Sequence, residues 1–184
     1  MSQSSVSVMG IDPSLTSTGV AYMQGAVPKA YALGYPKLRG LSRIYRVREA
    51  VLYHVDRAKP DLVVYEGYAM AGNGKVFDLG ELGGQLKMEI LLRGIDLLVV
   101  PPSNLKLFMA GKARRGADGK NDVKAGVQTE FDVQFSSSDQ YDATGLLLMG
   151  EAYKRCRPLP RDRRHFKHRA LSGCQLLSAS EFLN

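Results

Sequence analysis

The sequence VMGIDPSLTSTGVA, residues 8–21, decides the fold class of this chain. Its first apolar residues are typical of a strand, which ends at Asp12 because Pro13 lacks the N–H group that a sheet ladder needs. A turn rich in hydroxyl groups then reverses the chain into a second apolar run at residues 20–23. The stretch therefore predicts two antiparallel strands, the first of which ends on an acid.

Two interpretations fit Asp12. A carboxylate at the end of a strand is costly to leave unpaired unless it meets water, a cation or a metal ion. In the first interpretation it accepts hydrogen bonds from the backbone of its own turn. In the second it belongs to a functional site, which requires further acids at equivalent positions in the fold.

The composition indicates one globular unit. With 184 residues and 45% hydrophobic content, the chain can bury one core. The polar residues 1–5 lack the features of a secretion signal, and no apolar run approaches the roughly 20 residues of a membrane span. We therefore expect a cytoplasmic protein with no membrane partner. Cys156 and Cys174 are too few for a disulfide framework or a zinc site.

The net positive charge of the chain comes from one segment. Residues 154–169 contain eight basic residues and one acidic residue, so this segment alone accounts for the net charge of +7. We divide the chain into a folded domain at residues 1–155 and a basic C-terminal arm at residues 156–184. Such an arm suits a polyanion, and the alternative is a solvated tail that only aids solubility.

The remaining pattern predicts an α/β fold with a mixed sheet of five strands, the first three antiparallel, flanked by helices. Arg39, Arg43 and Arg46 lie on the polar side of the first expected helix and are interpreted as a solvated face, with a binding stripe as the alternative. The expected elements after the hairpin are a strand at 29–34, a helix at 41–58, a strand at 61–66, a helix at 76–90, a strand at 95–100, a short helix at 103–109 capped by Ser103, a helix at 123–131, and a helix within 136–149 whose start is marked by the serines at 136–138.

Glu66 ends a second strand, residues 61–66, whose branched and aromatic side chains suit a sheet buried on both faces. Packing does not explain two strands that each finish on an acid. If the two strands are parallel neighbours, Asp12 and Glu66 come together at the same end of the sheet. This is the first indication of a metal site.

Asp139 and Asp142 lie three residues apart at the start of the last long helix, where they can point the same way. Acids are also favoured at helix N-termini by the helix dipole, which is the alternative explanation. Asp142, however, already lies inside the apolar sequence that must pack on the sheet. Four carboxylates form a hard oxygen site that prefers Mg²⁺ or Mn²⁺, and two such ions can promote hydrolysis of a phosphodiester.

Tyr68 and a pair of glycines follow Glu66. Tyr68 either caps the core or stacks on an unpaired base. Gly80 and Gly84 fall four residues apart on the expected helix and allow close approach of another backbone, either of the sheet or of a second subunit. Farther along, the basic, glycine-rich residues 111–120 predict a loop that contacts phosphates, with a solvated surface loop as the alternative.

These motifs, taken in order over about residues 6–155, resemble the RuvC family of Holliday junction resolvases. The resemblance implies an RNase H-like fold, a homodimer formed through the helix after Glu66, and an endonuclease that cuts four-way DNA junctions to leave 5′-phosphate and 3′-hydroxyl ends. It also implies that two Mg²⁺ or Mn²⁺ ions are held by four catalytic acids, which are Asp12, Glu66, Asp139 and Asp142.

The resemblance further implies that Lys106 and Lys120 contact DNA near the active site. The wider set of expected DNA-binding residues is Tyr68, Lys75, Lys106, Lys112, Arg114, Arg115 and Lys120. Tyr68 replaces the family's phenylalanine, and residues 111–120 are longer than its usual loop, so the chain is closer to phage-type resolvases that accept other branched DNA. The alternatives are a related nuclease acting on RNA, similar to the YqgF group, an actin-like phosphotransferase, and a non-catalytic DNA-binding module.

Overall fold

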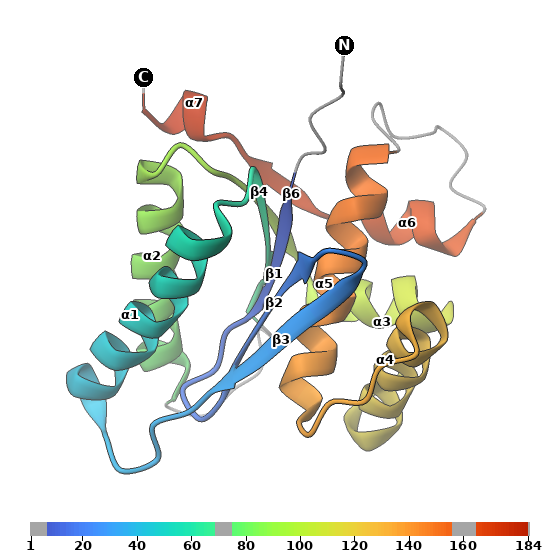
Figure 1. Ribbon diagram of the computed structural model, residues 1–184, viewed down its shortest axis with the longest axis horizontal. Coiled ribbons are helices and arrows are strands. Elements are labelled where there is room, and N and C mark those ends of the chain that lie inside the picture. The colour runs from blue at the N-terminus through green and yellow to red at the C-terminus, as the bar shows by residue number, and fades with distance from the viewer. Residues whose placement is uncertain (1–6, 69–74, 156–164, 184) are drawn as a thin grey trace.

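A computed structural model describes residues 7–68, 75–155 and 165–183, apart from the side chain of Lys75. A mixed sheet forms the middle of three layers (Figure 1). Its strands, in the spatial order β3-β2-β1-β4-β5-β6, are β1 (Val8–Asp12), β2 (Thr18–Gln24), β3 (Val27–Leu33), β4 (Leu62–Glu66), β5 (Asp96–Val100) and β6 (Gln175–Leu177). The helices are α1 (Gly40–Ala58), α2 (Lys75–Leu92), α3 (Pro102–Ala110), α4 (Gly116–Phe131), α5 (Ser138–Arg155), α6 (Phe166–Ser172) and α7 (Ala179–Phe182).

The strand directions confirm the predicted fold class. β1, β2 and β3 are antiparallel neighbours, whereas β1, β4 and β5 are parallel neighbours. In the β1–β4 pair, Ile11 lies beside Tyr65, so the residues that follow them, Asp12 and Glu66, end adjacent strands at the same level. The register thus brings together two acids that are 54 positions apart.

Within the described residues the sheet has six strands, one more than the sequence predicted. β6 pairs antiparallel with β5 and comes from the segment expected to form the basic arm. At three residues, it is too short to show an alternating pattern. The preceding helix, α6, also contacts the domain, because the Asn104 side chain in α3 donates a hydrogen bond of 2.8 Å to the carbonyl of Ala170.

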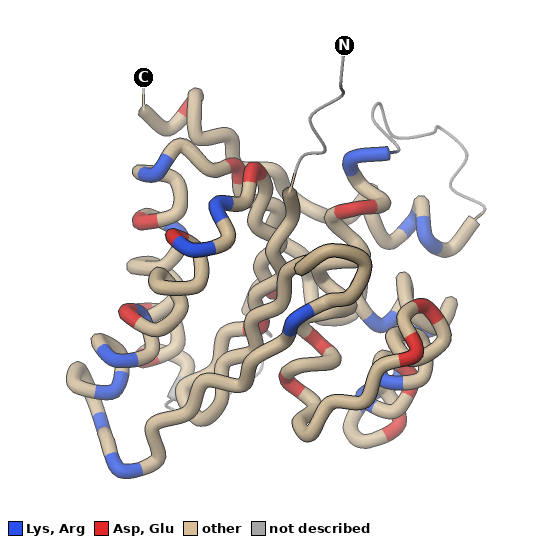
Figure 2. Tube along the Cα trace, viewed as in Figure 1, with Lys and Arg blue, Asp and Glu red and all other residues tan. Residues whose placement is uncertain are grey.

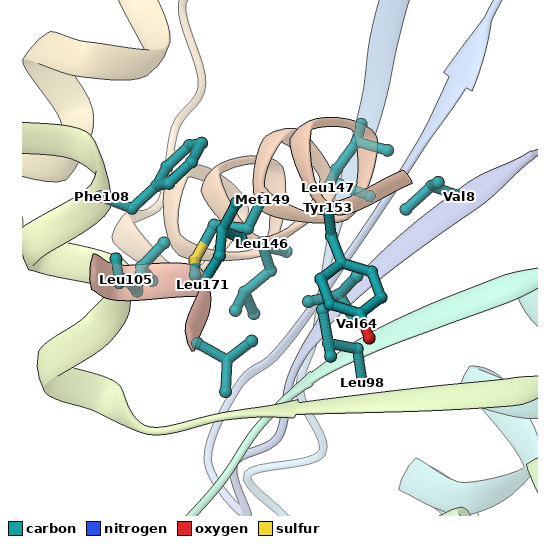
Figure 3. Close-up of a cluster of buried hydrophobic side chains, with 14 of the residues drawn as sticks. Val8, Val64, Leu98, Leu105, Phe108, Leu146, Leu147, Met149, Tyr153 and Leu171 are labelled. Atoms are coloured by element: carbon teal, nitrogen blue, oxygen red, sulfur yellow. The ribbon is translucent and has the colours of Figure 1, made fainter. Parts of the chain in front are cut away.

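α5 packs directly on the sheet because two glycines leave room for its backbone. A Cβ atom at Gly10 would lie 2.0 Å from the carbonyl oxygen of Ala143, and one at Gly19 would lie 2.1 Å from that of Asp139. Figure 3 shows the apolar side chains of α5 between the sheet, α3 and α6. This close packing carries the first turn of α5 to the end of β1.

α1 and α2 cover the opposite face of the sheet, over a second apolar core. Ion pairs join the two helices, from Arg48 in α1 to Glu89 in α2 and, at 2.8 Å, from Arg93 directly after α2 to Asp56 in α1. In the part of the chain that the structure describes, no helix combines the length and the apolar character needed to cross a membrane.

Two predicted helix starts were wrong. α4 begins at Gly116, inside the expected loop, because Asp118 lies in its first turn and pairs with Arg114 at 3.7 Å. The connection between α3 and α4 is therefore only residues 111–115. α3 begins at Pro102 after Pro101, and the Ser103 hydroxyl donates to the Asn104 side chain rather than capping the helix.

Candidate active site

Asp12 and Glu66 form the centre of the candidate site. Their carboxyl groups are hydrogen-bonded to each other at the carboxyl ends of β1 and β4. Asp12 is 8% exposed, and Glu66 is partly buried. The structure therefore brings together the two strand-end acids, as the sequence predicted.

The turn after Asp12 satisfies its own polar groups. Thr18 donates a hydrogen bond of 2.6 Å to the carbonyl of Ser14, and the Ser14 N–H donates to the Thr18 hydroxyl at 3.1 Å. Among the hydrogen bonds of this turn, none runs from a backbone N–H to the Asp12 carboxylate. The interpretation of Asp12 as a residue that only stabilises its own turn is therefore wrong.

α5 supplies the other two acids. Asp139 lies in its first turn, where the Ser137 hydroxyl donates a hydrogen bond of 2.9 Å to its carboxylate. Asp142 lies one turn farther and is partly buried. The charges of Asp139 and Asp142 are both close enough to raise the pKa of Asp12. All four predicted acids therefore share one end of the sheet.

Burial controls the protonation of these acids. It raises the pKa of Asp12 well above its usual range, and the charges of Glu66 and Asp142 raise it further. Burial also raises the pKa of Glu66, and it raises that of Asp142 to about 7. Because buried carboxylates without a cation are unfavourable, the Asp12–Glu66 pair holds a proton up to a higher pH than exposed carboxyl groups do.

Lys106 and Lys120 extend from α3 and α4 toward the acids. Their charges lower the pKa of both Glu66 and Asp142, opposing the effect of burial. The Lys120 ammonium also donates a hydrogen bond of 3.1 Å to the hydroxyl of Ser138 at the start of α5. The two lysines predicted near the active site therefore lie beside it.

The donor set suits a hard divalent cation, because the clustered groups are carboxylates. The arrangement is not that of a preformed metal site: within residues 7–68, 75–155 and 165–183, no three His, Cys, Asp or Glu side chains are placed to hold one ion. The chemistry of the residues fits Mg²⁺ or Mn²⁺, and the acids must turn toward a common point to coordinate it.

The other expected DNA contacts divide into three groups. Lys112 and Arg115 are exposed between α3 and α4. Arg114 is bound within the chain, since its guanidinium donates a hydrogen bond of 2.7 Å to Asp122. The side chain of Lys75 lies outside the described residues.

Tyr68 turns back onto α2. Its hydroxyl lies 3.5 Å from the Gly80 carbonyl, and its ring lies 5.0 Å from the Lys87 ammonium. A Cβ atom at Gly83 would be 1.7 Å from the Tyr68 hydroxyl, so this position depends on glycine. In this conformation Tyr68 packs on the protein, and its contact with DNA stays a prediction.

Sequence reasoning missed the roles of Ser137 and Ser138. These serines were interpreted only as signals for a helix start. In the structure Ser137 orients Asp139 and Ser138 receives Lys120. The signal that could have identified them is their position directly before Asp139.

Comparison with known proteins identifies the fold. No family model and no curated protein matches the chain. Among solved structures, RuvC from Thermus thermophilus superposes with a TM-score of 0.63 at 21% identity, covering 82% of this chain and 96% of that chain. The same protein in complex with a Holliday junction substrate gives 0.66 at 19% identity, with the same coverage.

A more distant structure has the same fold. The Fowlpox virus resolvase in complex with substrate Holliday junction DNA superposes with a TM-score of 0.54 at 12% identity, covering 79% of this chain and 97% of that chain. The chain therefore has the fold of RuvC and other Holliday junction resolvases, as the sequence motifs predicted.

Proposed function

We propose that this chain is a metal-dependent endonuclease that resolves four-way DNA junctions, leaving 5′-phosphate and 3′-hydroxyl ends. The observation that carries the proposal is the clustering of the Asp12, Glu66 and Asp142 carboxyl groups where parallel strands meet the start of α5. The similarity in fold to two resolvases solved with junction DNA supports the same substrate class.

Asp12, Glu66, Asp139 and Asp142 would hold Mg²⁺ or Mn²⁺, with two ions per active site. When bound, such ions supply an activated water and stabilise the leaving oxygen of a phosphodiester. The carboxylates themselves give the site its negative charge, and Asp12 is the one of the four that is buried. Coordination requires the Asp12–Glu66 pair to release its proton, which links metal affinity to pH.

Lys106 and Lys120 have two roles in this proposal. The carboxylates alone would repel a DNA phosphate. The two ammonium groups offset this repulsion and attract the phosphate to the site. They also lower the pKa of Glu66 and Asp142, and so favour the ionised form that binds cations. The hydrogen bond to Ser138 holds Lys120 beside the first turn of α5.

The proposal includes a homodimer formed through α2. Large apolar side chains are exposed on this helix, at Phe77 (79%), Met88 (51%) and Leu92 (55%). Gly80 and Gly84 have no atom within 4 Å of their Cβ positions, so another backbone can approach there. A second copy would bury this surface and provide one active site for each of two opposed strands.

A nicking assay tests the proposed function. Purified protein is incubated with a four-way junction, a flap, a linear duplex and a structured RNA, each with Mg²⁺ or Mn²⁺. We expect cutting of the junction with ends that DNA ligase can join. Asp12→Asn should bind the junction without cutting it, because it removes a ligand but keeps the shape. An Asp12→Asn protein as active as the wild type would refute the metal-dependent mechanism, and preferential cutting of RNA would refute the substrate.

A further inference from the structure

The start of α1 and the loop before it carry an excess of positive charge. Between Asp12 and Glu49 the sequence contains no acidic residue and six basic ones, five of them within residues 37–48. Figure 2 shows these basic positions gathered along the loop and the first turns of α1. The local excess lies far in sequence from the basic segment 154–169.

Three of these cations are available to a partner. Lys37, Arg39 and Arg46 are exposed, and no described carboxylate forms an ion pair with any of them. By contrast, Arg48 pairs with Glu49 and Glu89. The three available cations are therefore distinct from Arg48, whose ion pair with Glu89 links α1 to α2.

Stability of α1 does not explain this arrangement. The first turn of α1 contains no acid, and Arg39 occupies its N-cap position without a side-chain capping bond. Basic groups at a helix N-terminus oppose the helix dipole. Their presence is therefore a cost to α1, which an anionic partner would offset.

Apolar side chains are interleaved with the cations. Leu41 is 72% exposed and Tyr45 is 54% exposed, and the Arg46 guanidinium lies 6.0 Å from the Tyr45 ring centroid. Together with Leu38 and Ser42 they line a hollow of about 420 Å³. Cationic groups beside an exposed aromatic ring suit a nucleic acid, whose phosphates and sugars they can contact together. We call Lys37, Arg39, Leu41, Tyr45 and Arg46 the α1 patch.

The α1 patch begins at the active-site end of the sheet. Leu33, the last residue of β3, pairs with Thr18, whose neighbour Gly19 pairs with Asp12. β3 therefore ends two strands from Asp12, or about 10 Å across the sheet. A Cβ atom at Gly34 would lie 2.9 Å from the carbonyl of Thr16, so the loop starts against the turn that follows Asp12.

The acids lie between two basic regions on opposite faces of the sheet. Lys106 and Lys120 approach them from α3 and α4, and the α1 patch lies on the side of α1 and α2 (Figure 1). A branched DNA, whose arms diverge from one point, can place a phosphate backbone on each side of the acids. A single straight duplex presents only one such path.

We infer that the α1 patch binds the phosphate backbone of a second DNA arm, on the opposite face from Lys106 and Lys120. This inference rests on the proposed function and names a binding surface that gives the site its preference for branched over linear DNA. Arg39 and Arg46 supply the phosphate contacts, and Tyr45 and Leu41 support the sugars.

Binding without divalent cations tests the inference independently of cutting. The double variant Arg39→Gln/Arg46→Gln is compared with a control of equal charge change, Lys29→Gln/Lys59→Gln, whose side chains are exposed outside the patch. Affinity for a four-way junction should fall about tenfold in the patch variant. The slope of log K against log salt concentration should become shallower by about 2, because two phosphate contacts are lost. Affinity for a linear duplex should fall less, and the control should match the wild type. Unchanged thermal unfolding of both variants verifies that they are folded.

The outcomes separate this inference from the proposed function. If the wild type cuts junctions and the patch variant binds as tightly as the control, the inference is wrong and the function stands. If the patch variant loses junction binding but the wild type cuts nothing with either metal, the α1 patch is a DNA-binding surface and the proposed nuclease function is wrong. If the wild type binds no junction, both are wrong. Loss of binding to anionic lipid vesicles, with DNA affinity unchanged, would assign the α1 patch to a membrane surface instead.

Discussion

Gly10 in β1 lies directly against the carbonyl oxygen of Ala143 in α5, with 2.0 Å between that oxygen and the position of a Cβ atom on residue 10. No side chain fits there without moving the helix. The first two turns of α5 carry Asp139 and Asp142, two of the four acids, so this contact links backbone packing to the geometry of the site.

Gly10→Ala should therefore impair the site without changing any acid. We expect the free energy of unfolding to fall by about 1–3 kcal/mol or more, and the rate of junction cutting to fall because α5 is displaced. Val51→Ala, in the fully buried face of α1, is a control that destabilises the protein without moving α5. Equal cutting rates for the two variants at a temperature where both are folded would show that the Gly10 contact does not position the acids.

The raised pKa of Asp142 predicts that stability depends on pH. Its ordinary value is 3.8 and its folded value is about 7, so between these values the folded protein holds a proton that the unfolded chain has lost. The free energy of unfolding in metal-free buffer should therefore fall as pH rises from about 4 to about 7, on the order of 1–4 kcal/mol from this group. Denaturant unfolding at several pH values measures this change in the free energy of unfolding.

Asp142→Asn is the control for this pH dependence, because the amide does not titrate. Its free energy of unfolding should exceed that of the wild type at pH 8 in a chelating buffer, and the difference should shrink toward pH 4. Added Mg²⁺ should stabilise the wild type more than the variant, since it binds the folded state. A constant difference across this pH range would contradict the folded pKa.

Lys120 should set the acid limb of the pH–rate profile. Its charge lowers the pKa of Asp142, so Lys120→Gln should move the limb to higher pH and weaken DNA binding. Lys112→Gln removes an exposed charge from the neighbouring loop and should weaken binding while leaving the limb in place. Identical shifts in the two variants would mean that Lys120 acts only through the overall charge.

The exposed apolar surface of α2 predicts the oligomeric state. Phe77→Glu should convert a dimer into a folded monomer, because it places a charge at the most exposed apolar side chain of the proposed interface. Val27→Glu, at a side chain 52% exposed on β3, is the matched control and should leave the dimer intact. Sedimentation velocity distinguishes the two states, and a monomeric wild type would refute the α2 interface.

Much of this site follows from local sequence rules. Strands that end on Asp12 and Glu66 and a helix that begins near Asp139 each have a local signature, and parallel pairing of β1 with β4 brings the strand ends together. The ion-pair partners of Arg114, Asp118 and Asp122, could not be predicted from the sequence, because these ion pairs depend on where α4 begins. β6 was missed because pairing with β5, rather than an internal pattern, makes those three residues a strand.

The pairing of β6 with β5 also determines how the C-terminal region can be studied. A truncation that removes the basic residues after α5 would also remove β6 and leave Leu97, Leu98 and Val99 with open backbone groups along an apolar strand. Such an open edge strand promotes association between chains. At the opposite edge of the described sheet, β3 contains Pro28, which lacks the backbone N–H group that a further strand would need. Aggregation of a shortened protein would then mimic a loss of DNA binding, so charge-neutralising substitutions that keep β6 in place are the appropriate way to measure what the basic residues contribute.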